Sequence, residues 1–173
     1  PRDALFFAIS QSGETADTLG AVNEIRLKGG DILGVVNVIG STIARTCGRG
    51  VYVHSGPEIA VASTKAFTSQ VTALLVFTLM LARTRNLSLT QGKEVANGLA
   101  AMPELVERYL GNPGPIMQAV ELICAARYVL YLGRGFSYPV ALEGALKLKE
   151  IAYIPCEAYP AGEMKHGPIA MLE

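Results

Sequence analysis

Short apolar runs alternate with segments of helical periodicity over the first third of the chain. The runs ALFFAI (4–9) and DILGVVNV (31–38) are almost continuously apolar, which is typical of strands covered on both faces. Between them, residues 13–30 place apolar side chains at near-helical spacing and end on two glycines, a common helix stop. A short helix at 41–47 and a strand at 51–55 continue the alternation. This order predicts an α/β fold with an open parallel sheet and helices on both of its faces.

The same alternation begins again after a long helical stretch. Helices are expected from about Ile59 to Thr84 and, with more polar residues, from about Leu89 to Tyr109. GNPGP (111–115) interrupts this pattern with two prolines and two glycines. A second apolar strand then ends in a glycine-rich turn within ARYVLYLGRGFSYP (126–139), and a helix follows over 140–153.

These breaks predict two related lobes. We place the first over residues 1–110 and the start of the second over residues 111–173. The longest apolar stretch, VTALLVFTLMLA (71–82), is shorter than the roughly 20 residues needed to span a bilayer. We expect it to form a buried core helix, and we expect no membrane partner.

Composition narrows the function further. Lys plus Arg and Asp plus Glu number 15 each, so no basic tract favours nucleic acid or an anionic membrane. The three cysteines are widely spaced and form no CxxC pattern, which indicates buried thiols in a reducing, cytoplasmic compartment. The chain opens without Met or a signal peptide and runs almost at once into a strand, so we expect a piece of a longer protein.

Hydroxyl side chains gather directly after the first apolar run. Ser10, Ser12 and Thr15 flank Gly13 where the predicted strand passes into a helix. At this edge of a parallel sheet, the N–H groups and positive dipole end of a helix are available to an anion. No lysine stands where a nucleotide P-loop needs one, so the pattern favours a compact phosphate monoester.

Two other interpretations of the glycine-containing turns stay open. Ser12 or Thr15 could simply cap the helix, with Glu14 favourable in its first turn. The later turn GRGFS (133–137) is close to a dinucleotide fingerprint but lacks the third glycine, which disfavours a nucleotide.

A second group of polar side chains lies in the helix predicted over 140–153. Lys147 and Glu150 are three residues apart and share a helix face with Glu143, so an acid and a base could enter one pocket. From the spacing alone, an ordinary Glu143–Lys147 surface pair is the favoured explanation. His166 stands in a loop flanked by Gly and Pro, whereas His54 falls in a predicted strand and is interpreted as structural. Two histidines and scattered thiols assemble no metal site, so no metal is expected.

Four segments, taken together, resemble one family: SQSGETADT (10–18), VASTKAFTSQ (61–70), GRGFSYPVALEGALKLKEIAYI (133–154) and AYPAGEMKHGP (158–168). They resemble the sugar-isomerase region of the glucosamine-6-phosphate synthases, the isomerising glutamine–fructose-6-phosphate transaminases. SQSGET alone indicates only the wider sugar isomerase (SIS) family, and the other segments are more specific to the synthases. The resemblance covers essentially the whole chain.

The resemblance implies parts of two SIS lobes, each a three-layer α/β/α sandwich around a parallel sheet, and no cofactor. It implies a substrate, fructose 6-phosphate, that is converted with ammonia into glucosamine 6-phosphate. The residues it assigns to substrate binding are Ser10, Gln11, Ser12 and Thr15 at the phosphate, with Ser63 lining the sugar site and Val61 as a neighbouring backbone contact.

The same resemblance implies the catalytic residues. Glu150 corresponds to the base that moves a proton between C1 and C2, with Lys147 beside it. His166 corresponds to the ring-opening residue, which in this family comes from the second subunit of a homodimer.

The resemblance also indicates what this sequence lacks. Missing are the glutaminase domain, the first strand and Ser/Thr turn of the first lobe, and a carboxyl-terminal lysine that forms a Schiff base, so we expect the chain to be inactive alone. Two other functions remain open: a non-catalytic SIS module that senses sugar phosphates, and a related amino-sugar phosphate isomerase or deglycase. The first would need the phosphate loop without Glu150, Lys147 or His166.

Overall fold

The computed structural model describes residues 3–171, and the chain divides into two compact units. Unit 1 comprises Pro1–Pro103 and unit 2 comprises Glu104–Glu173. The division falls within helix α4 (Leu89–Leu110), which contains Pro103. Because each unit has its own sheet, each is described separately below.

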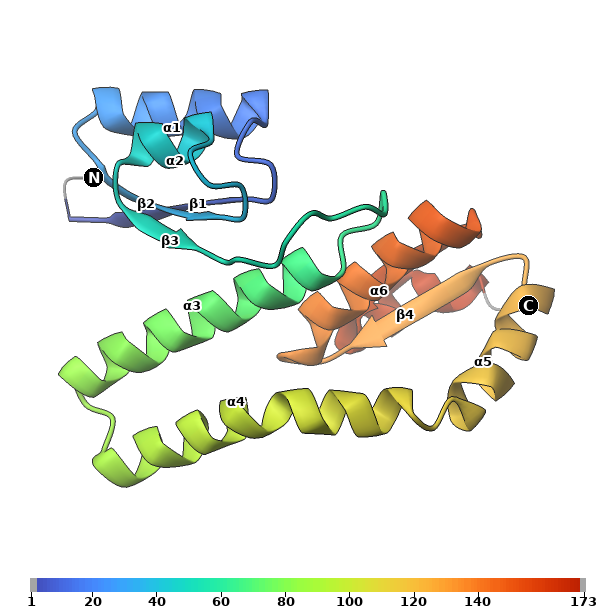
Figure 1. Ribbon diagram of the computed structural model, residues 1–173. Coiled ribbons are helices and arrows are strands. Elements are labelled where there is room, and N and C mark those ends of the chain that lie inside the picture. Colours follow the sequence, from blue (N-terminus) through green and yellow to red (C-terminus); the bar gives the residue numbers. More distant parts are fainter. Residues whose placement is uncertain (1–2, 172–173) are drawn as a thin grey trace. The chain divides into compact units, whose positions relative to one another are not determined.

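Unit 1 is built on a parallel sheet of three strands in the order β1-β2-β3 (Figure 1). The strands are β1 (Leu5–Ser10), β2 (Asp31–Val36) and the short β3 (Gly50–Tyr52). All three carboxyl ends therefore meet at one edge, as the alternating pattern predicts. The predicted α/β class with a parallel sheet is confirmed.

The strands of unit 1 present two different apolar faces. Helices α1 (Ala16–Leu27) and α2 (Thr42–Cys47) lie together on one face (Figure 1), where Val22 and Ile43 pack with Ala8, Ile32 and Val36 in a buried core. Residues that alternate with these along the strands point to the other face, toward α3 (Lys65–Thr84). There the rings of Phe7 and Phe77 meet edge to face, 4.9 Å apart.

The loop that joins α1 to β2 follows the predicted glycine stop. Gly29 has a φ of +74°, and its N–H donates to the carbonyl of Arg26. The N–H of Gly30 donates to the carbonyl of Ile25. This pair of hydrogen bonds is the Schellman arrangement, in which glycine supplies the left-handed conformation that ends the helix.

The apolar stretch 71–82 is helical as predicted, but the prediction that it is buried was wrong, and so was the predicted helix start near Ile59. The chain is not helical between Ile59 and Thr64, and within α3 only Ala66 is buried. A three-stranded sheet is narrow, so it covers only one side of a helix that is apolar nearly all round. By length and composition alone α3 could cross a membrane, a test that the core helices of soluble proteins also pass.

Unit 2 contains a second strand-helix-strand element. Strand β4 (Val129–Gly133) pairs in parallel with β5 (Cys156–Pro160), and α6 (Ser137–Ala152) connects them and packs against both. Helix α5 (Gly114–Ala125) precedes β4. The sequence pattern did not predict β5, because Cys-Glu-Ala-Tyr-Pro alternates too weakly and ends on proline. Two short 3₁₀ helices follow, η1 (Ala161–His166) and η2 (Pro168–Met171).

Two smaller predictions were wrong. His54 lies beyond β3 in a loop and not in a strand, because the chain turns there with a φ of +51°. Cys47 and Cys156 are buried as expected, but Cys124 is exposed on α5, whose described residues include no buried position.

Candidate functional site

The carboxyl edge of the unit 1 sheet carries the segment Ser10–Thr15, named here the hydroxyl loop. The Oγ atom of Ser10 is buried, accepts the N–H of Gly13 at 2.9 Å and lies 3.5 Å from Oγ1 of Thr15. The hydroxyl of Ser12 is exposed and accepts the N–H of Glu14 at 3.2 Å. Ser10 therefore shapes the loop from inside, while Ser12 and Thr15 remain open to a ligand.

The chain segment that leads into α2 supports this loop from behind. The N–H groups of Asn37 and Val38 donate to the carbonyls of Ser10 and Gln11, both at 3.3 Å. The N–H of Ile43 donates to the carbonyl of Gly13 at 2.9 Å. Because three of its carbonyls are bonded to a neighbouring segment, the backbone of the hydroxyl loop is fixed without any ligand.

Gly13 is required at the centre of this loop for two reasons. Its φ is +68°, a conformation that side chains disfavour. A Cβ atom at this position would lie 1.9 Å from Oγ of Ser41 and 2.9 Å from Cγ1 of Val36. The close approach of the loop to α2 therefore depends on the absence of a side chain.

Glu14 is turned away from the open side of the loop. Its Oε1 accepts the N–H of Thr42, in the first turn of α2, at 2.8 Å. This backbone hydrogen bond, with a contribution from Arg45, lowers the pKa of the Glu14 carboxyl below its usual value. The carboxylate thus stabilises the start of α2, where a negative charge is favourable.

Among the described residues, no side chain caps the start of α1. Thr15 is the N-cap residue by its backbone, but its side chain makes no capping hydrogen bond. The alternative that Ser12 or Thr15 serves as an ordinary cap is therefore not what the geometry shows. Free N–H groups at a helix start, next to exposed hydroxyls, can bind a compact anion.

Val61 and Ser63 lie in the loop before α3. Val61 is 93% exposed and Ser63 is half-buried, with the buried Ala62 between them. Asn37, which the sequence analysis did not single out, anchors the beginning of this loop: its side chain is hydrogen-bonded to Ser55 and Gly56. Its position after an apolar strand was the one signal that could have found it.

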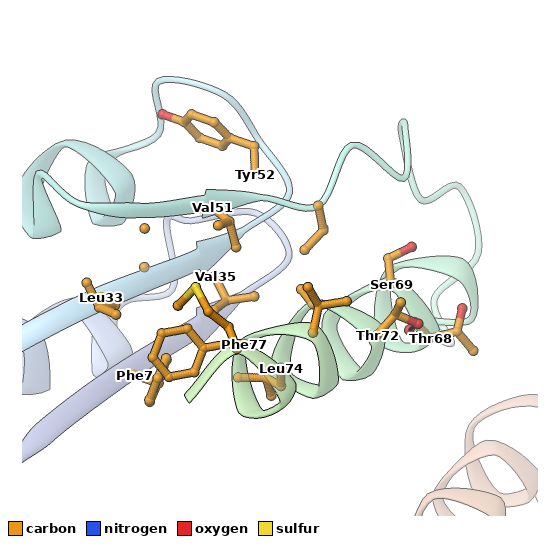
Figure 2. Close-up of a pocket in the computed structure, with 16 residues that line it drawn as sticks. Phe7, Leu33, Val35, Val51, Tyr52, Thr68, Ser69, Thr72, Leu74 and Phe77 are labelled. Carbon is orange, nitrogen blue, oxygen red and sulfur yellow. Dashed lines mark hydrogen bonds between the residues drawn. The ribbon is translucent and has the colours of Figure 1, made fainter. Parts of the chain in front are cut away.

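A cavity between the sheet and α3 is a separate feature of unit 1. It has a volume of about 570 Å³ (Figure 2). Its lining is mostly aliphatic and aromatic, with Phe7, Leu33, Val35, Leu74 and Phe77 facing one another. None of the predicted site residues lines it. Its chemistry is that of an incompletely filled core and not of a sugar-phosphate site.

In unit 2, helix α6 brings three charged side chains together. Nζ of Lys147 lies 2.8 Å from Oε2 of Glu150 and 3.2 Å from Oε1 of Glu143. These side chains are 23%, 30% and 25% exposed, respectively, so all three are partly shielded from water. The predicted Lys147–Glu150 face and the alternative Glu143–Lys147 pair are therefore both formed.

The two carboxylates set the charge state of the lysine. Partial burial alone would lower the pKa of Lys147, but its hydrogen bonds and charge interactions with Glu150 and Glu143 raise it above the usual value. Lys147 is therefore a stable cation at neutral pH. It is suited to pair with the carboxylates beside it and not to act as a nucleophile.

His166 is exposed at the end of η1. Among residues 3–171 it has no hydrogen bond or ion pair to Lys147 or Glu150. Its imidazole is accessible, and its predicted role stays a prediction.

The sequence matches the model of the SIS domain over residues 1–80 and 121–173. The chain belongs to the SIS domain family. The match includes the hydroxyl loop, the charged face of α6 and His166.

Individual relatives of this SIS chain carry a more specific name. It is 50% identical over 171 residues to the glutamine–fructose-6-phosphate aminotransferase (isomerizing) of Chlorobaculum tepidum, and 52% identical over 167 residues to that of Bacteroides thetaiotaomicron. These alignments cover 99% and 96% of this chain but 28% and 27% of the relatives. The predicted resemblance is confirmed, and the chain spans little more than a quarter of these curated relatives.

A solved structure supports the same relationship. The C-terminal domain of the glucosamine-fructose-6-phosphate aminotransferase from Francisella tularensis superposes with a TM-score of 0.93 at 43% identity. The superposition covers 98% of this SIS chain and 48% of the other chain.

Proposed function

We propose that this chain is part of the sugar-isomerase region of a glutamine–fructose-6-phosphate aminotransferase. In this function it binds fructose 6-phosphate and takes part in its isomerisation from ketose to aldose during the formation of glucosamine 6-phosphate. One observation carries the proposal: a chain about half identical to enzymes named isomerizing holds Glu150 against a cationic lysine on α6.

The hydroxyl loop is the proposed phosphate anchor. A sugar phosphate would accept hydrogen bonds from the hydroxyls of Ser12 and Thr15, the free N–H groups at the start of α1 and the side chain of Gln11. Ser10 would contribute through its hydroxyl and by shaping the loop. Rotation of Glu14 toward α2 supports this assignment, because it removes a carboxylate that would repel phosphate.

Glu150 is the proposed base. Isomerisation of a 2-ketose phosphate removes a proton from C1 and delivers one to C2, so a single carboxylate can serve both carbons, and the proton it holds can exchange with solvent between the two steps. The ammonium of Lys147 lies 2.8 Å from Oε2 of Glu150 and holds this carboxylate in place. Lys147 is proposed to act beside the base and not as a Schiff-base lysine.

The remaining roles are proposed from the resemblance. His166 opens the sugar ring and is supplied in trans within a homodimer. Val61 and Ser63 contact the sugar, ammonia comes from a glutaminase domain of the longer protein, and the enzyme works in the cytoplasm.

The test is isomerisation by the full-length protein in deuterium oxide. With fructose 6-phosphate alone, the proposal predicts deuterium incorporation at the carbon that exchanges its proton, detected by NMR. A sugar-phosphate sensor would bind the substrate without exchange, and a protein that acts on another amino sugar would not bind it. Either result would contradict the proposal.

A further inference from the structure

The loop between β3 and α3 is fastened at both ends by side chains that the proposed function does not use. At its beginning, Asn37 is 7% exposed, and its Nδ2 donates to the carbonyl of Gly56 at 2.7 Å. Its Oδ1 accepts both the N–H and the hydroxyl of Ser55, each at 2.9 Å. These bonds fix the chain just after the turn at His54.

The other end of the loop is closed by a carboxylate. Oε2 of Glu58 accepts the N–H groups of Thr64 at 3.1 Å and Ala66 at 3.0 Å, and Oε1 lies 3.4 Å from the hydroxyl of Thr64. Thr64 is the N-cap of α3, but its own side chain makes no capping hydrogen bond. Glu58 therefore caps α3 from six residues upstream, where a negative charge is favourable.

The hydrogen bonds of Glu58 to Thr64 and Ala66 join the two ends of the loop segment 59–63. Ala62 is buried at 2% exposure, whereas Ile59 and Val61 are 92% and 93% exposed. Exposed apolar residues at a loop tip have no packing of their own to fix their position. The backbone that presents Val61 and Ser63 is held instead by the bonds of Glu58 to the start of α3.

We infer that Glu58 is a positioning residue that determines affinity for the carbohydrate part of the substrate. The inference rests on the proposed function, in which Val61 and Ser63 contact the sugar. The hydroxyl loop has its own supports at Asn37, Val38 and Ile43, none of which involves Glu58. Loss of the Glu58 carboxylate should therefore weaken binding of fructose 6-phosphate while leaving binding of inorganic phosphate unchanged.

The experiment uses Glu58→Gln and Glu58→Ala in the full-length protein. Glu24→Gln is the matched control, because it removes an exposed carboxylate of unit 1 that pairs only with Lys28. Calorimetry measures the affinities for fructose 6-phosphate and for inorganic phosphate. Hydrogen exchange is followed by mass spectrometry in a peptide that covers residues 58–68, and thermal unfolding verifies that each variant is folded.

For Glu58→Ala we expect faster exchange in this peptide and a loss of fructose 6-phosphate affinity of roughly three- to thirtyfold, the range for removal of a helix cap. Glu58→Gln should have a smaller effect, because one acceptor oxygen remains. Phosphate affinity and the Glu24→Gln control should not change.

Unchanged exchange would overturn the role of Glu58 in holding the loop. Equal changes in affinity for both ligands, or none for either, would overturn its role in sugar binding. If the unmodified protein binds no fructose 6-phosphate, the proposed function fails on that result alone, and the exchange measurement still decides whether Glu58 holds residues 59–63.

Discussion

The hydroxyl loop of unit 1 and the charged face of α6 in unit 2 are built in different ways. The hydroxyl loop is held by its backbone: three of its carbonyls are bonded to the segment before and within α2, and Gly13 allows close contact. The α6 face is held by its side chains, since Lys147 is bonded to two carboxylates on its own helix.

This difference is consistent with the proposed division of the reaction between the two parts. A site fixed through its backbone suits a ligand group that does not change during the reaction, such as a phosphate. The α6 face instead presents a carboxylate, Glu150, whose position depends on a side-chain ion pair with Lys147. We therefore expect substitutions in the two regions to affect different steps.

The largest effect is expected for Glu150→Gln. The substitution keeps the size of the side chain but removes the base, so isomerisation should fall by roughly two to four orders of magnitude, the usual contribution of a general base. Affinity for fructose 6-phosphate should stay nearly normal in calorimetry. Glu143→Gln is the control, because it removes the other carboxylate bonded to Lys147 and should have a much smaller effect. Equal losses for the two variants would refute the assignment.

Ser12→Ala and Thr15→Ala should mainly affect binding. A hydrogen bond to a charged group contributes about 1.5–3 kcal/mol. Each substitution should therefore weaken the binding of fructose 6-phosphate by roughly ten- to a hundredfold. Thr72→Ala removes a hydroxyl that is bonded only within α3 and serves as the control. Unchanged calorimetric affinity in both loop variants would exclude the hydroxyl loop as the phosphate anchor.

Gly13→Ala tests the backbone support of the loop. A side chain at this φ, in contact with Ser41, should lower the free energy of unfolding of unit 1 by about 1–3 kcal/mol and reduce phosphate binding. Gly20→Ala is the control in which no clash is expected, because Gly20 lies in α1 and no atom is within 4 Å of the added Cβ. It should stabilise the helix by about 0.5–1 kcal/mol. Similar denaturation curves for the two variants would contradict this account.

The smallest effects are expected at opposite extremes of pH. The Glu14 carboxyl has a lowered pKa, so its contribution to stability is complete above its ordinary value of 4.5 and is lost as the pH falls through the folded value. Lys147 has a raised pKa, so its contribution is complete below 10.5 and is lost as the pH rises through the folded value. Exchange of the Thr42 amide should report the acidic transition, and NMR titration of Lys147 the alkaline one. Titration of both groups at their ordinary values would contradict these assignments.

Local patterns in the sequence were sufficient to predict the parallel sheet, the hydroxyl loop and the shared helix face of Lys147 and Glu150. The hydroxyl loop and the α6 face are marked by residues that are close together along the chain, and the parallel sheet follows from the alternation of strands and helices. Contacts between distant segments were not predictable in this way. The hydrogen bond from Thr42 to Glu14 and the bonds of Asn37 to Ser55 and Gly56 join segments that are far apart along the chain.

The exposure of α3 illustrates the same limit. Its apolar composition indicated burial, but burial depends on how much surface the neighbouring sheet offers. The strand β5 was missed because its pairing with β4, and not its own side-chain pattern, defines it. The role of His166 depends on the proposed second subunit and so on contacts outside a single chain.

The measurement that tests the division of roles most directly is solvent deuterium incorporation at saturating fructose 6-phosphate. It should be made in parallel on full-length Glu150→Gln and on the Ser12→Ala/Thr15→Ala double variant. The account predicts that exchange is nearly abolished in Glu150→Gln, whereas the double variant exchanges at close to the unmodified rate once enough substrate is added to fill the site. Exchange at the unmodified rate in Glu150→Gln would show that Glu150 is only an ion-pair partner of Lys147 and would contradict the central claim.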